Sequence, residues 1–257
     1  MPKAAEIAAF ADSLLRTHEI PDYPNALNGL QVGTDAEISK LGAAVDFSAR
    51  AVGLAAKAGV NLLLVHHGAF WDGLAPITGR RLRVLSDLLS ASIGVYSSHL
   101  PLDCHPVLGN NVLLAQRLGL VPESPFGKFN EISIGTSGHS ACLVSELLDT
   151  ATTFAQEHGG HVHSTPFRTG RNVGRWAICT GAGADSDTLR EAGQRGIETL
   201  IVGEGPHWTA VRAEESGLVL IYAGHYVTET LGVQALAAAI SAEFRIPWEF
   251  IAAPTGT

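Results

Sequence analysis

The sequence contains few charged residues and no long run of lysine or arginine. Charged side chains account for 16% of the 257 residues, and the formal net charge at pH 7 is −8. A protein that binds nucleic acid mainly through the phosphate backbone needs a clustered basic surface. This composition therefore argues against direct nucleic-acid binding.

Long apolar segments and a cysteine framework are also missing. No stretch of about 20 uninterrupted apolar residues occurs, so we predict no transmembrane helix and no membrane partner. Glu6 and Asp12 interrupt the apolar pattern of residues 1–16, which is not typical of a signal peptide. Only three cysteines occur, far apart, so we expect reduced thiols and a cytoplasmic protein: Cys104, Cys142 and Cys179.

Apolar residues are plentiful, at 46% of the chain, which is enough for one large or two smaller cores. Strand-like and helix-like patterns alternate, which predicts an α/β protein, and the sparse charge suits an oligomer. The predicted strands cover residues 41–46, 62–65, 93–97 and 176–180. The predicted helices cover residues 3–18, 49–58, 80–90, 110–118, 145–158, 188–195 and 231–244.

Two adjacent histidines, His66 and His67, end the most apolar of these strands. Neighbouring side chains on a strand point to opposite faces, so the two rings can converge only if the chain bends at Gly68. Imidazoles at a strand end can bind a divalent metal. The alternative is a pair of ordinary polar residues at a sheet edge.

The chain repeats this pattern. Residues 59–71 match residues 196–208 without a gap, and residues 94–99 match residues 219–225. Each second strand leads to a histidine with a carboxylate four positions later, namely His99 with Asp103 and His225 with Glu229. The repeat predicts two related α/β halves whose strand ends meet across one cleft.

Three histidines and two carboxylates exceed what one catalytic zinc requires, since such a zinc usually has three protein ligands. Five ligands suit two metals about 3.5–4 Å apart, which can activate a shared water. The donor set fits Zn, Mn, Fe or Mg and does not choose among them. The predicted ligands are His66, His67, Asp103, His225 and Glu229.

Other polar residues receive weaker assignments. We expect His99 to orient Asp103 or contact the substrate, although it could also be a ligand. Glu204 and His207 are expected at the rim of the site, with an ordinary loop position as the equal alternative. Asp46 is a weaker rim candidate. The remaining cluster, His158, His161 and His163, could bind a metal but is interpreted as a solvated turn followed by a strand, and Cys104 is interpreted as a packing residue.

Taken together, these segments resemble the Nif3-like family of dinuclear metal proteins, often named GTP cyclohydrolase 1 type 2. The resemblance covers nearly the whole chain and depends on residues 28–33, 65–68, 99–103 with 109–111, 203–207 and 224–229. It implies two intertwined α/β halves with mixed sheets, a toroidal homo-hexamer, and the same five metal ligands, with Glu229 as the bridge. The halves would be residues 1–125 and 191–257, with residues 126–190 completing the core.

The resemblance leaves two functions open. The first is a metal-dependent hydrolase with a small-molecule substrate, with GTP as the nucleotide that the family name proposes. No P-loop or guanine-reading motif supports GTP itself. The second is a non-catalytic metal-binding adaptor or metal-handling factor that acts through partner proteins.

Overall fold

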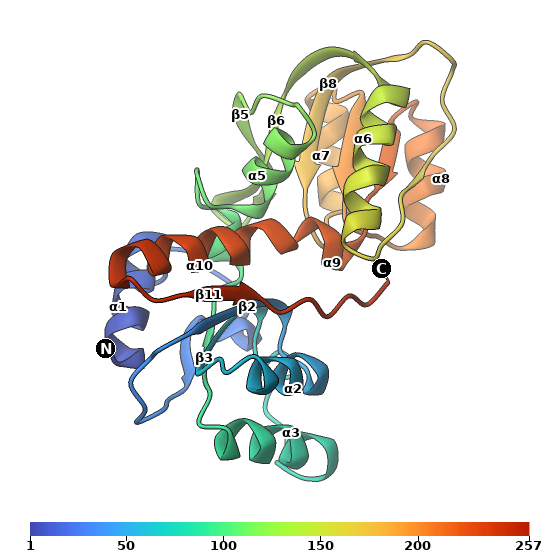
Figure 1. Ribbon diagram of the computed structural model, residues 1–257. Helices are drawn as coiled ribbons and strands as arrows, with labels where there is room; N and C mark the ends of the chain where they lie inside the picture. The colour runs from blue at the N-terminus through green and yellow to red at the C-terminus, as the bar shows by residue number, and fades with distance from the viewer. Residues whose placement is uncertain (257) are drawn as a thin grey trace. The chain divides into compact units, whose positions relative to one another are not determined.

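The computed structural model describes residues 1–256, which form two compact units (Figure 1). The first unit contains Met1–His105 and Gly232–Ala253, and the second contains Pro106–Leu231 and the residues from Pro254 on. These borders differ from those of the three predicted segments, because the chain returns to its first unit near the C-terminus. No helix among the described residues is long and apolar enough to cross a membrane.

A five-stranded sheet forms the centre of the first unit, in the order β1-β4-β3-β2-β11. Its strands are β1 (Gly29–Val32), β2 (Leu41–Asp46), β3 (Leu62–His67), β4 (Gly94–Ser97) and β11 (Trp248–Phe250). All pair in parallel except β1, which is antiparallel at the edge.

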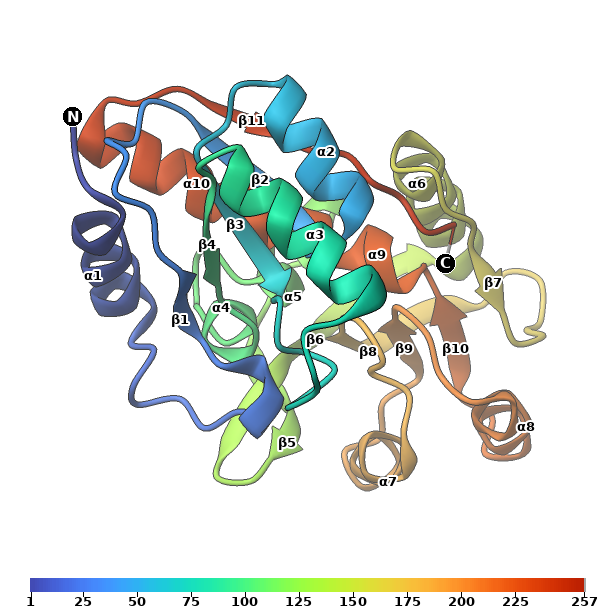
Figure 2. The same ribbon diagram turned by 90° about the horizontal axis from the view of Figure 1, so that it is seen from below.

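Helices cover both faces of this sheet. They are α1 (Ala4–Leu15), α2 (Ala49–Lys57), α3 (Gly79–Ser90), the short α4 (Leu100–Asp103) and α10 (Thr230–Phe244), with a 3-10 turn at Pro24–Ala26. Figures 1 and 2 show α2 and α3 on one face and α10 on the other. This cover explains why the first five residues of both β2 and β3 are buried.

The second unit has a six-stranded mixed sheet in the order β5-β6-β8-β9-β10-β7, in which β8, β9 and β10 are parallel. Its strands are β5 (Ser124–Phe129), β6 (Ile132–Leu143), β7 (His163–Ser164), β8 (Asn172–Cys179), β9 (Thr199–Val202) and β10 (Val219–Tyr222). Its helices are α5 (Asn110–Arg117), α6 (Val144–Glu157), α7 (Ser186–Gln194), α8 (His207–Glu215) and α9 (His225–Thr228).

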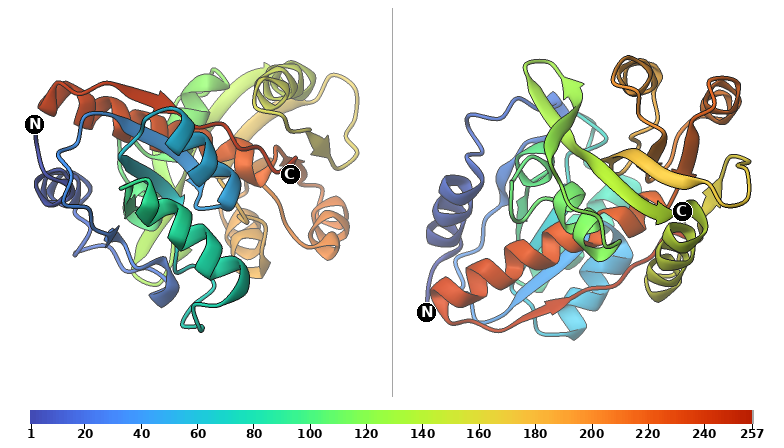
Figure 3. Two further views of the ribbon diagram at one scale, coloured as in Figure 1. Left: turned by 60° about the horizontal axis from the view of Figure 1, so that its bottom comes forward. Right: turned by 90° about the horizontal axis from the view of Figure 1, so that it is seen from above.

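Alternate strand residues of this sheet pack into two separate apolar layers. Trp176 and Ile178 pack with residues of α5 and α6, whereas Ala177 between them packs with residues of α7 and α8. Figure 3 shows the orange helices α7 and α8 on the side of the strands away from α6. Residues 176–179 of β8 are therefore buried on both faces of the sheet, because neighbouring side chains on a strand point to opposite faces.

The same strand and helix order occurs in both units, which supports the predicted duplication. The run β2-α2-β3-α3-β4-α4 corresponds to β8-α7-β9-α8-β10-α9. In the paired strands, Leu62 lies beside Gly94 and Thr199 beside Val219. Each copy of the sequence repeat begins with a glycine at positive φ, +71° at Gly59 and +64° at Gly196, where the chain leaves a helix.

Candidate metal centre

Three histidines of the first unit form a compact cluster at the end of its central strand. His66 and His67 are the last residues of β3, and His99 directly precedes α4. One ring nitrogen from each lies within 4.8 Å of the other two. The rings of His66 and His67 are 4.8 Å apart between centroids, so these neighbours converge where β3 ends. This arrangement could hold a metal ion.

Each of these imidazoles donates a hydrogen bond from Nδ1 to an oxygen atom. The pairs are His66 with the Ser98 carbonyl at 2.9 Å, His67 with Asp46 at 2.8 Å and His99 with Asp22 at 2.8 Å. Carbonyl and carboxylate oxygens only accept, so Nδ1 carries the proton in each ring. Nε2 then carries the lone pair, which is the tautomer in which a histidine binds a metal through Nε2.

Asp103 adds a buried carboxylate to the same place. It is the last residue of α4, and its Oδ2 lies 3.4 Å from Nε2 of His66. The helix forms directly after His99, with Pro101 in its first turn, where the missing N–H is not needed. One turn of helix thus brings Asp103 to the histidines.

Asp22 anchors His99, which the sequence reading did not foresee. Its second oxygen accepts from the Leu100 N–H at 2.9 Å and from the Asn28 amide at 2.8 Å. Burial opposes ionisation of Asp22. The hydrogen bond and charge of His99, together with hydrogen bonds from Asn28 and from the Leu100 backbone, nevertheless hold the pKa of Asp22 below its usual value. Asp22 is therefore an ionised partner that fixes the start of α4.

The amides of Asn28 and Gln31 hold backbone in place. Asn28 accepts a hydrogen bond from the His99 N–H at 2.7 Å, and Gln31 accepts one from the Ala69 N–H at 2.7 Å. Gln31 lies so close to Gly68 that an added Cβ would be 2.2 Å from its amide nitrogen. Gly68 thus permits the close approach that fixes the chain after His67.

In the second unit, His225 and Glu229 face each other at the start of α9 and just after it. Nε2 of His225 lies 3.2 Å from Oε2 of the buried Glu229, and its Nδ1 donates to Glu204 at 2.7 Å. Burial disfavours the charged imidazole, but the charges and hydrogen bonds of Glu229 and Glu204 raise the pKa of His225 to about 9. Glu229 and Glu204 therefore favour positive charge on the imidazole of His225.

The glycine turn after β8 makes room for Glu229. Gly181 has φ +63°, and a Cβ added there would lie 2.2 Å from Oε1 of Glu229. The N–H of Gly181 donates to the Thr228 hydroxyl at 3.1 Å. The sequence predicted a turn here, and the structure shows that the turn also borders the carboxylate.

The expected rim residues line a cavity of about 370 Å³ in the second unit. Glu204 and His207 share it with His161, His163 and Tyr222. The sequence did not indicate a site role for His161 and His163, which reach the cavity because β7 pairs with β10. Within residues 1–256, His161 and His163 belong to no group of three close ligand atoms.

Two further positions show what sequence reasoning can and cannot find. The sequence indicates only a rim position for Asp46, whereas in the structure it lies beside His67 in the β2–β3 register and accepts a hydrogen bond from that ring. Cys104 was expected to pack, and it is half-buried. Burial, with the charges of Asp103 and Asp22, raises the pKa of the Cys104 thiol to about 12.

Known proteins resemble the chain over its whole length. The family model described as Duf34/NIF3 (NGG1p interacting factor 3) matches residues 2–255. A protein named GTP cyclohydrolase 1 type 2 homolog from Deinococcus radiodurans is 38% identical over 253 residues, covering 98% of this chain and 93% of the relative. The crystal structure of TTHA1606 from Thermus thermophilus is 33% identical, with a TM-score of 0.85 and full coverage of both chains.

Proposed function

Because this chain belongs to the DUF34/NIF3 family, we propose that it is a dinuclear metal-binding protein that acts as a metal-dependent hydrolase. One observation carries the proposal. His66 in the first unit and His225 in the second each have Nδ1 hydrogen-bonded to an oxygen and Nε2 close to a carboxylate. Purely structural histidines do not need this repeated arrangement.

The proposed ligands come from both units. They are His66, His67 and Asp103 from the first unit and His225 and Glu229 from the second, with Glu229 as the bridge. Imidazole and carboxylate donors without thiolate suit Zn, Mn, Fe or Mg. Two such ions would supply the Lewis acidity for attack of water on an electrophilic carbon or phosphorus atom.

The other residues of the site would orient ligands and contact the substrate. Asp46 and Glu204 accept from Nδ1 of His67 and His225, which fixes each Nε2. His99, Glu204 and His207 are candidates for substrate contact or proton transfer. The names of the relatives suggest a nucleotide substrate, with GTP the first to test. We further propose that the chain assembles as a homo-hexamer.

Elemental analysis of protein purified without chelator tests the proposal. We expect two tightly held divalent ions per chain, a strong loss in His66→Ala, and no loss in His18→Ala, where an exposed histidine of the same unit is replaced. Absence of stoichiometric metal, or full retention in His66→Ala, would contradict the site.

Turnover assays then separate the two functions. Release of product from a nucleotide, lost in His66→Ala, is the expected result for a hydrolase. Two ions that exchange readily, with no turnover of any nucleotide, would support the metal-handling alternative instead.

A further inference from the structure

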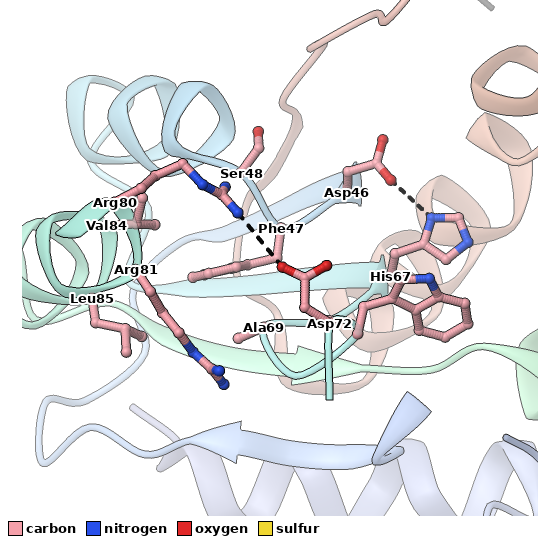
Figure 4. Close-up of a pocket in the computed structure, with 12 residues that line it drawn as sticks. Asp46, Phe47, Ser48, His67, Ala69, Asp72, Arg80, Arg81, Val84 and Leu85 are labelled. Carbon is pink, nitrogen blue, oxygen red and sulfur yellow. Dashed lines mark hydrogen bonds and ion pairs between the residues drawn. The ribbon is translucent and has the colours of Figure 1, made fainter. Parts of the chain in front are cut away.

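A second feature of the first unit, a cavity beside His67, has not been given a role so far. A cavity of about 200 Å³ lies where β2 and β3 end and where α2 and α3 begin (Figure 4). Its lining includes the ligand His67 and its partner Asp46 on one side and Arg80 and Arg81 on the other. The carboxyl ends of parallel strands are where open α/β sheets bind their ligands.

Two arginines place positive charge at this cavity: Arg81 is held in position, whereas Arg80 forms an exposed ion pair that can exchange partners. Arg81 donates to the Ala75 carbonyl at 3.1 Å and lies over the Phe70 ring at 5.5 Å, so its position is held. Arg80 is directed towards Asp72, at 3.5 Å (Figure 4). Both side chains of this ion pair are largely exposed, at 72% and 80%, so the pair contributes little and can exchange its anion.

The backbone at the cavity adds to the positive potential. The first turn of α3 contains no acidic residue, and Thr78 makes no side-chain hydrogen bond to cap it. The N-terminus of a twelve-residue helix with free amides attracts anions, and Arg80 and Arg81 belong to this turn. In contrast, α2 begins at the same cavity with Ser48, which accepts from the Ala51 N–H at 3.1 Å.

We propose that this cavity binds the phosphate group of a nucleotide, with Arg80 as the residue that exchanges Asp72 for the ligand. Its volume is below the about 300–1,000 Å³ of sites that enclose whole drug-sized ligands, so it fits one group of the ligand. Contact with His67 would place the rest of the nucleotide at the metal centre. The role as a substrate subsite depends on the proposed function, whereas the binding itself does not.

Calorimetric titration with guanosine monophosphate and with guanosine, on the full-length protein with its metal, tests this site. We expect Arg80→Gln to weaken binding of the monophosphate about tenfold and to leave guanosine unchanged. Arg80→Lys should recover part of the loss. Arg83→Gln, an exposed arginine of the same helix outside the cavity, is the matched control and should bind like wild type.

Asp72→Asn gives a result of opposite sign. It removes the anion that competes for Arg80, so the monophosphate should bind up to about fivefold more tightly. Equal binding of monophosphate and guanosine by the wild type, or unchanged binding in Arg80→Gln, would overturn the proposal. Phosphate-dependent binding without any turnover would contradict the proposed hydrolase function but not the phosphate site. Turnover of a nucleotide that Arg80→Gln does not affect would contradict the phosphate site but not the hydrolase function.

Discussion

At the scale of single residues, the oxygen atoms behind the histidines matter as much as the histidines. Ser98, Asp46 and Asp22 each hold an Nδ1 in the first unit, and Glu204 does so in the second. Without such partners an imidazole rotates and changes tautomer, so it loses affinity for a metal. Substituting one of these oxygen-bearing partners therefore tests the site while every proposed metal ligand stays in place.

Asp46→Ala should lower metal affinity by about 10- to 100-fold, since His67 would lose the acceptor that orients it. Competition with a coloured chelator measures the affinity. Asp46→Asn keeps an oxygen acceptor and should lose less. Asp87→Asn, on the exposed side of α3, is the control. Wild-type affinity in Asp46→Ala would show that His67 needs no partner.

The sequence revealed the residue types of the proposed ligands but not most of their partners. His66 and His67 stand out because they end an apolar strand, and His225 stands out through the repeat. Asp22 could not be found this way, because it lies 77 positions before His99 in an irregular segment with no periodic pattern. Only folding of the chain brings such pairs together.

At the scale of elements, the turn between β8 and α7 is as important as the helices that carry ligands. Its glycine at position 181 combines a positive φ with a close contact to Glu229. Replacement by any larger residue would affect both the backbone and the carboxylate.

Gly181→Ala should destabilise the protein by about 2–4 kcal/mol and reduce its metal content, because the Cβ adds a clash to the backbone strain. Gly170→Ala isolates the strain, since Gly170 has φ +74° and no atom within 4 Å of the added Cβ. It should cost about 1–2 kcal/mol and leave the metal in place. Thermal unfolding and elemental analysis provide both readouts, and equal effects of the two variants would refute the argument.

Many helices and buried strands could be read from the sequence, whereas the β5–β6 hairpin and β11 could not. The predicted strand over 41–46 coincides with β2, and the helix predicted over 145–158 lies within one residue of α6. The β5–β6 hairpin was missed because β6 is half-exposed and rich in glycine and serine. Similarly, β11 has only three residues and depends on pairing with β2.

At the scale of the whole molecule, the proposal assigns ligands to both units and gives Glu229 a bridging role. A shared centre bridged by Glu229 predicts that both ions are lost together when the bridge is removed. Two independent mononuclear sites would respond differently, because a change in one unit would leave the ion of the other unit bound.

Glu229→Gln should lose both ions together, since a bridging carboxylate serves both. Elemental analysis per chain measures this loss, and circular dichroism checks that the variant is folded. The control is Glu215→Gln, which changes an exposed carboxylate at the end of α8. Full retention of one ion would rule out the bridge.

The return of the chain to its first unit also determines the order in which the protein can be completed on the ribosome. The second unit is nearly continuous in sequence and can fold once residue 231 has emerged. In contrast, the outer edge of β2 can be paired only after β11 (Trp248–Phe250) has been synthesised, about 200 residues later. The sheet of the first unit, whose strands are synthesised first, is therefore completed last. Until β11 is made, the outer edge of β2 is unpaired, and an unpaired strand edge can aggregate with other chains.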